Sequence, residues 1–580
     1  MDVQQLEEAW ALRAGAREAR LVEAPHVPAA LTLLGIVRPG DRLVTFADDF
    51  TEAFASGFDA CDVAMVDEPL AAAFAAAFLF FAPAFAQDIE NIYFNGISSS
   101  VESAYLNEPS NWYADPDRTK PFEGSLDGAN YGKYDAYVSF SKGQLPILTS
   151  LRDGSVTDLR NLNYSVSGIN GRNDILTFGG SKILRTYGDW NLSLKLDPAA
   201  ANESVVSVGM WEYAKADIRG DWNINVDKNG ASGWFGLRIY DRDSNRPASF
   251  LVHGNVVVSS GNDRELILYT ENNSFLVEGA VDLNGNCWGI AANNTGLSRS
   301  IGGLGDADGN GKGHGKLYML NTSADSEATI NFTNSEACDF SGAFQAKADN
   351  GYKALLNLAM MASDSRNGRQ ILRFSKMGTS WPNRTSVTDT DINNVEVNSG
   401  RLDIGMYDGM KGANLSIYGY SGNASDAVFS AAGLSSGQEI GRVQFDSMTF
   451  YEGTIVFDLG EVENDFIQIN GGVTKSSAAS QITFDMNITK DDLQMYLEAL
   501  GAETMEWDLM SFKTDDSDFA LTDIILKTQA GIDGELSFLA DDSSGLTTVQ
   551  LSLGVIPEPA AIAAIIGAIA LSLAALRRRK

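Results

Sequence analysis

The closest match to a known metal-binding pattern is Asp306-Ala307-Asp308-Gly309-Asn310-Gly311. It follows the first half of a calcium-binding loop, in which oxygen donors at positions one, three and five surround the ion and a glycine at position six makes the sharp turn. Position twelve should supply a bidentate glutamate, but here it is Leu317, and no amphipathic helix flanks the segment. We therefore predict a glycine-rich surface loop from Gly302 to Lys316, with no metal and no cofactor.

Histidine, a common catalytic and metal-binding side chain, is scarce in this chain. His26 precedes the predicted export cleavage point, which leaves His253 and His314. So few histidines argue against a histidine-rich metal site and against a Ser-His-Asp triad. P-loop and His-Glu-x-x-His motifs are absent from the sequence. We interpret His253 as a packed or rim residue, and we predict no catalytic residue and no enzymatic activity.

One enzymatic alternative stays open. Polysaccharide lyases and glycoside hydrolases use β-helices that carry paired carboxylates or Asp/Arg/Lys clusters on one face. The chain has ample aspartate, but no local constellation stands out, and a fold alone does not establish an activity. An enzyme of this kind should bring several carboxylates and an Arg or Lys together in one groove, whereas a scaffold should not.

The charge balance limits the partners. The chain has 43 Lys and Arg residues against 76 Asp and Glu residues, for a net charge of −33 at pH 7. The acidic residues are dispersed, which is typical of a solvated surface. Such a field repels nucleic acid, so we expect no nucleic-acid partner, whereas polysaccharide or glycan would be tolerated. The spacing of Cys287 and Cys338 demands no disulfide, and we expect free thiols.

A loose repeat organises residues 151–472. Gly188-Asp189-Trp190-Asn191 is echoed by Gly220-Asp221-Trp222-Asn223, and looser copies begin at Gly254 and Gly279. A unit of two or three short strands cannot bury its apolar face alone, but stacked copies share a continuous core. The pattern predicts a mostly β chain whose body is a parallel β-helix (β-solenoid), with the two tryptophans at equivalent places on adjacent coils. A β-sandwich or jelly roll is the alternative.

The segments on either side of the repeats predict caps. Residues 87–150 are rich in turn-forming residues and predict an N-terminal cap, and residues 473–554 predict a small β-rich C-terminal cap. Within the second cap, Thr489 opens a short helix like a capping box and Gly501 ends it. We expect this cap to cover the free strand edges of the last coil.

The first 86 residues differ from the body. Residues 6–24 are rich in Ala, Arg and Glu and predict a helix. We interpret residues 1–64 as a helical leader added by a mis-called start or a frameshift rather than a real cytoplasmic leader. Residues 65–86 have the apolar core and the Ala-x-Ala ending of a secretory signal peptide, although no basic segment precedes them. The predicted cleavage site comprises Ala84, Ala86 and Gln87.

The tail at residues 555–580 has three parts. A Pro-Glu-Pro triplet is followed by the uncharged segment 560–576 and then by four cations at the end of the chain. About 17 apolar residues are the lower limit for a membrane span, so this segment predicts a transmembrane helix. The positive-inside rule keeps the terminal cations in the cytoplasm and the body outside. The predicted sorting residues are Pro557, Glu558, Pro559, Arg577, Arg578 and Arg579.

This tail resembles the PEP-CTERM sorting signal of Gram-negative, biofilm-forming bacteria. Asn111-Trp112 and the 473–554 segment are similar to parts of autotransporter-associated β-strand repeat proteins. The resemblance implies processing by an exosortase-type enzyme, with anchoring in the inner membrane before processing and a final location at the cell surface or outside the cell. It predicts a structural or adhesive protein of the surface or extracellular matrix; the alternative is a surface polysaccharide-active enzyme, a lyase or a glycoside hydrolase.

Overall fold

The protein is described by a computed structural model. The described residues are 19–23, 31–35, 90–94, 104–106, 109–126, 133–140, 149–150, 156–200, 203–232, 235–241, 248–260, 266–271, 274–291, 295–305, 315–321, 326–348, 354–373, 392–405, 412–419, 426–433, 438–556 and 568–572. The chain divides into two compact units, Met1–Gln87 and Asp88–Lys580.

The first unit contains a strand where the sequence suggested a helix. β1 (Ala19–Glu23) pairs antiparallel with β2 (Leu31–Gly35), and Leu21 lies opposite Leu33. The predicted helix over residues 6–24 is therefore wrong over the residues of β1. Prolines 25 and 28 follow β1, and proline cannot sit in a helix interior without a lost hydrogen bond and a clash. The apolar strand β2 then provides a pairing partner.

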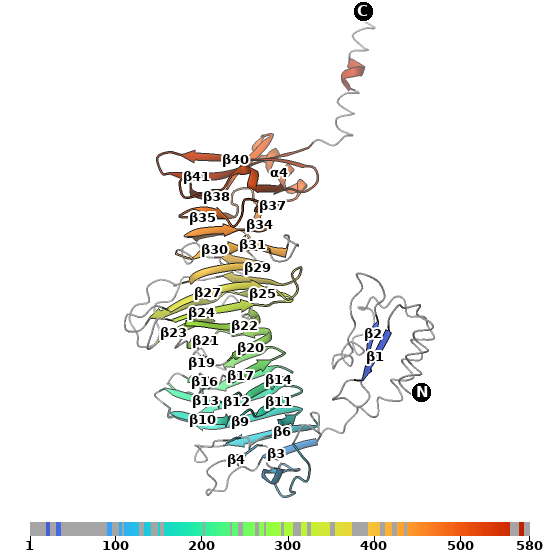
Figure 1. Ribbon diagram of the computed structural model, residues 1–580, viewed down its shortest axis with the longest axis vertical. Coiled ribbons are helices and arrows are strands. Elements are labelled where there is room, and N and C mark those ends of the chain that lie inside the picture. The colour runs from blue at the N-terminus through green and yellow to red at the C-terminus, as the bar shows by residue number, and fades with distance from the viewer. Residues whose placement is uncertain are drawn as a thin grey trace, which may run out of the picture. The chain divides into compact units, whose positions relative to one another are not determined.

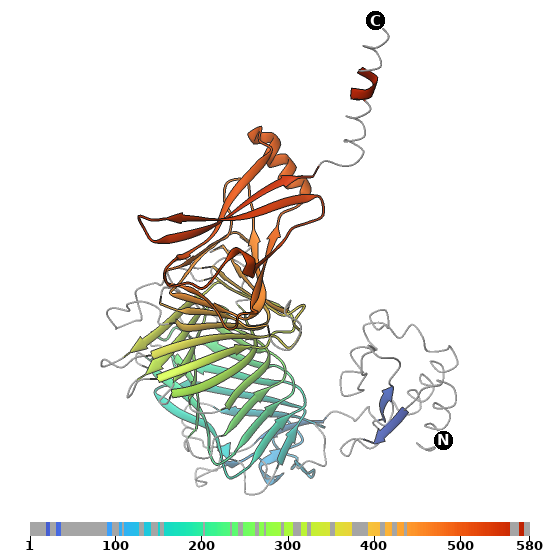
Figure 2. The same ribbon diagram turned by 45° about the horizontal axis from the view of Figure 1, so that its top comes forward.

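The second unit is mostly β, and its strands pair in parallel with strands three places further along the chain (Figures 1 and 2). These pairs include β10 (Arg172–Phe178) with β13 (Ser204–Met210), β11 (Ile183–Thr186) with β14 (Lys215–Ile218), and β12 (Trp190–Leu196) with β15 (Trp222–Asp227). Three strands thus make one coil, and each column of paired strands makes one face. This long parallel stack is consistent with the predicted β-solenoid and differs from the antiparallel hairpins of the alternative folds.

Each face is a column of strands. The first face is a 9-stranded sheet that also contains β4 (Ala104–Tyr105), β7 (Thr149–Ser150), β16 (Phe235–Asp241), β19 (Leu266–Glu271), β21 (Cys287–Ala291), β23 (Lys316–Asn321) and β26 (Ala343–Ala348). The second face adds β8 (Val156–Leu159), β17 (Ser249–Val252), β20 (Ser274–Asp282), β22 (Thr295–Gly305), β24 (Ser326–Phe332), β27 (Ala354–Met361), β30 (Asn414–Ile417), β33 (Ser447–Phe450) and β36 (Val473–Lys475).

The third face carries the candidate sites. Its lower strands are β3 (Glu90–Phe94), β6 (Tyr134–Phe140), β9 (Asn161–Ile169), β12, β15 and β18 (Val256–Ser260). Its upper strands are β25 (Ala337–Phe340), β28 (Arg369–Arg373), the end of β29 (Ile392–Gly405), β31 (Ala427–Ala431), β34 (Glu452–Asp458), β37 (Gln481–Asn487) and β39 (Ile524–Lys527). The long strands β20, β22 and β29 run from the second face into the third.

Alternate residues of each strand point into the coil and form one continuous core. In β12, Trp190, Leu192 and Leu194 are buried, while the residues between them face outward. Trp190 lies opposite Trp222 in the parallel register, and their ring centroids are 5.8 Å apart. The predicted equivalence of the two tryptophans is confirmed. Phe250 continues the column, with its ring centroid 4.7 Å from that of Trp222.

The repeated glycines mark a corner where successive coils touch. A Cβ atom on Gly220 would overlap Asp189 Oδ1 and the backbone of Gly188. Asp189 Oδ1 accepts a hydrogen bond from the backbone N–H of Asp221 at 2.9 Å, and Asp221 Oδ1 accepts one from the N–H of Asn255 at 2.7 Å. The Gly-Asx pair therefore packs each coil onto the one before it, which explains why the repeat has this sequence.

Positive φ angles occur at a different corner, where asparagine precedes glycine. The pairs Asn229-Gly230 and Asn284-Gly285 have φ values of 47° and 80°, and of 44° and 78°. Gly188 and Gly220 are not among the residues with positive φ. The repeat glycines are thus required by close approach, and the Asn-Gly pairs by backbone conformation.

The segment predicted to form the C-terminal cap contains the expected short helix and strands. α4 (Lys490–Leu500) begins after Thr489, whose side chain accepts from the Asp492 N–H, and it ends at Gly501 with φ 64°. β32 (Arg442–Phe445), β35 (Phe466–Ile469) and β38 (Thr504–Lys513) pair in parallel. β41 (Leu546–Val555) and β40 (Ile532–Asp541) then add antiparallel strands beyond β38 (Figure 2).

Two boundaries differ from the prediction. Parallel stacking begins with β3 and β6, before residue 151, because β5 (Trp112–Tyr113) covers only part of β3 and leaves its other edge for β6. Residues 302–305 belong to β22, although the sequence suggested a loop from Gly302 to Lys316. A Cβ on Gly302 would overlap the Glu278 backbone, so this glycine continues the close approach between coils. Cys287 and Cys338 are free thiols, as expected.

Candidate functional site

The residues predicted from the two ends of the chain lie outside the described part. These are Ala84, Ala86 and Gln87 at the export site, and Pro557, Glu558, Pro559, Arg577, Arg578 and Arg579 in the tail. Within the described residues, which include only 568–572 of the 560–576 segment, no helix is long and apolar enough to span a membrane. The sorting and cleavage assignments remain predictions.

The calcium-like segment Asp306–Gly311 also lies outside the described residues. Its twelfth position, Leu317, is described and is fully buried in β23, so this position faces the core rather than a cation. In the part of the chain that the structure describes, no group of three or more His, Cys, Asp or Glu side chains is arranged to hold a metal ion.

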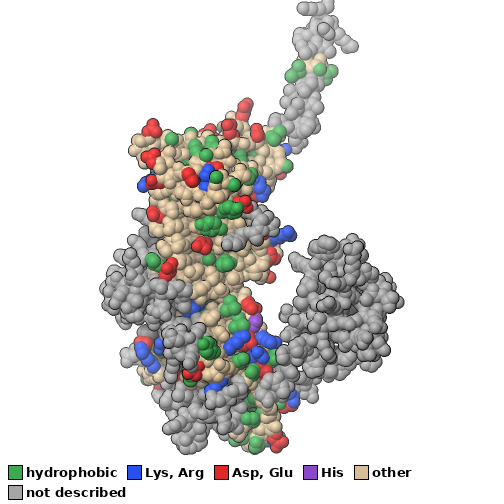
Figure 3. All heavy atoms as spheres, in the orientation of Figure 1, with side chains coloured by type: hydrophobic (Ala, Val, Ile, Leu, Met, Phe, Trp, Pro, Cys, Tyr) green, Lys and Arg blue, Asp and Glu red, His purple; other side chains and the backbone are tan. Residues whose placement is uncertain are grey.

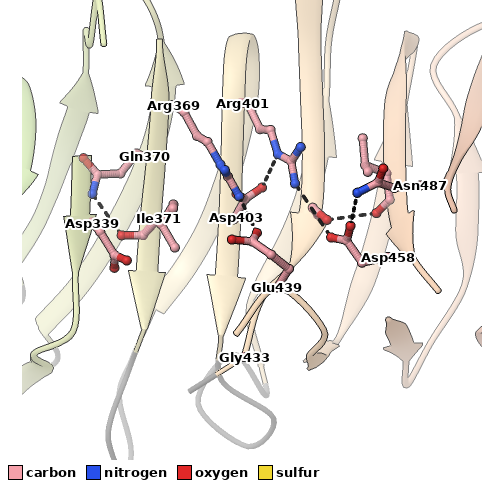
Figure 4. Close-up of polar contacts among 12 residues, drawn as sticks. Asp339, Arg369, Gln370, Ile371, Arg401, Asp403, Gly433, Glu439, Asp458 and Asn487 are labelled. Atoms are coloured by element: carbon pink, nitrogen blue, oxygen red, sulfur yellow. Dashed lines mark hydrogen bonds and ion pairs between the residues drawn. The ribbon is translucent and has the colours of Figure 1, made fainter. Parts of the chain in front are cut away.

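The structure does gather charged groups on the outer side of the upper third face (Figure 4). We call this set the arginine–carboxylate cluster. Its members are Asp339, Arg369, Arg373, Arg401, Asp403, Glu439, Asp458 and Asp465. The members that lie in strands share a face because adjacent strands are in register, with Arg369 opposite Arg401 and Ile371 opposite Asp403. Glu439 and Asp465 come from the connections before β32 and β35.

Asp403 is the centre of the cluster. Its side chain is fully buried and accepts hydrogen bonds from Arg369 and, at 2.7 Å, from Arg401 Nε. Arg369 Nη2 also contacts Glu439 Oε2 at 2.7 Å at the exposed rim. Burial alone would lower the pKa of Arg369, but the carboxylates of Asp403 and Glu439 raise it above its usual value. The Arg369 guanidinium therefore stays charged and joins β28 to Asp403 on the neighbouring strand β29, whereas Arg401 lies on the same strand as Asp403.

Arg373 attaches a connecting segment to this face. Its side chain is buried, and its Nε lies 3.1 Å from Asp339 Oδ2. Its Nη1 donates to the backbone oxygens of Gly433 and Gln438, at 2.8 Å and 2.6 Å. Both residues belong to the connection between β31 and β32. The guanidinium therefore holds this connection against β25 and β28.

Two carboxyl groups lie at the far end of the cluster. Asp465 is buried and accepts hydrogen bonds from the backbone N–H groups of Gly441 and Asp458 and from the Ser430 hydroxyl. Burial and the neighbouring Asp458 raise the pKa of Asp465 to about 8, against the lowering effect of those hydrogen bonds. Asp458 in turn accepts from Asn487, and its other oxygen lies 3.9 Å from Arg401 Nη2. Asp465 is thus protonated at neutral pH.

A second charged group lies on the lower second face around His253. His253 Nε2 is 3.1 Å from Asp217 Oδ1, and its Nδ1 is 2.8 Å from Glu278 Oε2. Arg185 and Lys215 also contact Asp217, at 3.0 Å and 3.4 Å. Figure 3 shows blue and red side chains around the purple histidine. The contacts agree with the prediction of a rim residue.

Burial would raise the pKa of Asp217, but hydrogen bonds and charges from Arg185, Lys215 and His253 lower it. Asp217 is therefore a paired anion rather than a proton donor. Such pairing matches a structural role, since the group that could accept a proton already contacts three basic side chains.

The arginine–carboxylate cluster was missed in the sequence, although a signal exists. Gly368-Arg369 and Gly400-Arg401 stand 32 residues apart, like Gly188 and Gly220. Extending the glycine repeat to these residues would have placed the two arginines on adjacent coils. No protein-family model matches this chain, and no curated protein matches it at a significant level.

Proposed function

We propose that this protein is an exported structural and adhesive β-solenoid of the cell surface or extracellular matrix, sorted through its PEP-CTERM-like tail. The observation that carries the proposal is that the charged side chains of the upper third face bind one another. Arg369 binds Asp403 and Arg373 binds Asp339 across coils, and Arg373 also attaches a connecting segment. These groups act as cross-links of a long parallel stack.

The tail and the export segment support the location. Export of the body requires a cleaved signal peptide, and anchoring in the inner membrane requires an apolar tail. The sequence predicts both segments, one at each end of the body. An exosortase-type enzyme would then release it, and polysaccharide or glycan would be the partner of the exposed body.

The alternative of a surface polysaccharide-active enzyme has one observation in its favour. The cluster brings several carboxylates and arginines together, and Asp465 has the raised pKa expected of a general acid. Asp465 and Asp403 are, however, fully buried and already bound by protein donors. A substrate would have to displace those donors, so we favour the scaffold.

The sorting test replaces Pro557, Glu558 and Pro559 together with alanine in the full chain, in an exosortase-containing Gram-negative host. The substituted protein should remain uncut in the inner membrane, while the unaltered chain is released. Release of both at the same rate would overturn the sorting proposal. Incubation of the released protein with polysaccharides separates scaffold from enzyme, since new reducing ends or unsaturated products would establish the enzyme.

A further inference from the structure

The lower third face carries an uncharged strip of side chains in a strongly acidic protein. One outward column contains Tyr93, Tyr137, Asn163, Asn191 and Asn223, which are opposite one another in the parallel register. The next outward column contains Ser139, Ser165 and Ser193. We call these two columns the tyrosine–amide strip.

A shallow groove of about 350 Å³ runs over this strip. It is lined by Tyr137, Val138, Ser139, Asn163, Tyr164, Ser165, Asn191 and Ser193, none of which is charged. In a chain with a net charge of −33, an uncharged groove favours a neutral partner over a cation or an anion.

Tyrosines form one end of the strip. The rings of Tyr93 and Tyr137 stack with their centroids 5.2 Å apart and their planes at 19°. Tyr137 is 37 % exposed, although most large apolar side chains of this unit are buried. The stack holds the Tyr137 ring in place, so its exposed part can contact the C–H face of a sugar ring with little loss of conformational entropy.

Amides continue the strip beyond the tyrosines. Asn191 Nδ2 donates to Asn163 Oδ1 at 3.0 Å, and Asn223 Nδ2 donates to Asn191 Oδ1 at 3.0 Å. A carboxamide has two N–H donors and two acceptor lone pairs. The ladder uses one donor and one acceptor of Asn191, which leaves the others for a ligand. Equivalent groups recur at the strand spacing, about 4.8 Å.

From these observations we infer that the tyrosine–amide strip binds a neutral polysaccharide chain, with sugar rings against Tyr137 and hydroxyl groups hydrogen-bonded by the asparagine and serine columns. This inference rests on the proposed adhesive function and assigns it a site. The hydroxyl groups of a neutral sugar both donate and accept, as do the carboxamides and serine hydroxyls that line the groove. An anionic polysaccharide would gain no counter-charge from these residues.

The test measures binding of the full-length protein to neutral glucan and mannan oligosaccharides, with polygalacturonate oligomers as the anionic comparison, by calorimetry. Neutral oligosaccharide should bind, and Tyr137→Ala should weaken binding roughly tenfold or more. Tyr137→Phe keeps the ring and should bind nearly as well as the unaltered protein. Tyr451→Ala is the matched control, because Tyr451 is 42 % exposed and lies outside the groove.

A second variant guards against an effect of Tyr137→Ala on folding. Ser193→Arg changes only an exposed position and should obstruct the groove, with a similar loss of binding and an unchanged melting temperature. If neutral oligosaccharide binds equally well to Tyr137→Ala and Ser193→Arg, the strip is not the site, while the adhesive function stands. If only polygalacturonate binds, or no oligosaccharide does, the inferred ligand class is wrong. Cleavage of any oligosaccharide would instead overturn the proposed scaffold function.

Discussion

The lower and upper parts of the third face are built on the same parallel strand ladder but use their outward side chains differently. Along the tyrosine–amide strip, the lower part presents neutral amides and hydroxyls in an open groove, and the ladder bonds of the strip link identical residues such as Asn191 and Asn223. The upper part presents arginines and carboxylates that are largely withdrawn from solvent, and its bonds link unlike charges around Asp403.

The difference shows that the stacked strands fix where outward side chains lie but not whether those side chains bind one another or a ligand. A neutral amide in the ladder uses one donor and one acceptor for its neighbours. Its second donor and second acceptor can bind a ligand. A buried carboxylate needs its partners, because an uncompensated charge in the interior is costly. The lower part is thus suited to recognition and the upper part to cross-linking.

The largest expected effect is the loss of the central carboxylate in the upper part. Asp403→Ala leaves Arg369 and Arg401 without their shared partner, and removal of one member of a buried ion pair costs about 3–5 kcal/mol. Urea unfolding of the variant should show this loss. Glu439→Gln, at the half-exposed rim, is the matched control and should cost about 0–1 kcal/mol. Equal midpoints for both variants would contradict a cross-linking role.

A second, smaller effect concerns pH. The pKa of Asp465 is raised from 3.8 to about 8 by burial and by Asp458, so the folded protein holds a proton that the unfolded chain releases above pH 3.8. This contribution to stability is complete below pH 3.8 and is lost as pH rises through about 8. Between pH 6 and pH 8, the free energy of unfolding should fall by roughly 2 kcal/mol.

The measurement is a series of urea unfolding curves at pH 6, 7 and 8. Asp465→Asn cannot titrate and should give a flatter profile, whereas Asn191→Ala, in the uncharged tyrosine–amide strip, should keep the slope of the unaltered protein. A flat profile for the unaltered protein would show that Asp465 is ionised in the folded state.

The smallest expected effect lies in the lower part. Asn191→Ala removes two amide–amide hydrogen bonds at a half-buried position and should cost about 1 kcal/mol. The cost should not change between low and high salt, because no charge is involved. Ser193→Ala, on the same strand but exposed, should change stability by less than about 0.5 kcal/mol. If the loss of stability in Asn191→Ala depended on salt, the contrast between a neutral lower ladder and a charged upper cluster would be wrong.

Much of the architecture could be predicted from local patterns. Alternation of apolar and polar residues identifies strands such as β12, and the capping residues Thr489 and Gly501 identify α4, because both signals depend on near neighbours in the chain. The strand β1 could not be predicted from local patterns. Its helix-forming composition is outweighed by pairing with β2, and that contact lies beyond the local pattern.

The stacking of successive coils follows from the sequence alone, since glycine, Asx and tryptophan recur at intervals that place equivalent residues on adjacent coils. The packing of Trp190 on Trp222 and the corner contact at Gly220 follow from that period. Which outward side chains meet depends instead on the three-dimensional packing of the chain. Asp403 lies in β29, whereas Glu439 and Asp465 belong to connecting segments and contact Arg369 and Ser430 of this face. Their burial, and hence the raised pKa of Asp465, depends on that packing and not on any local motif.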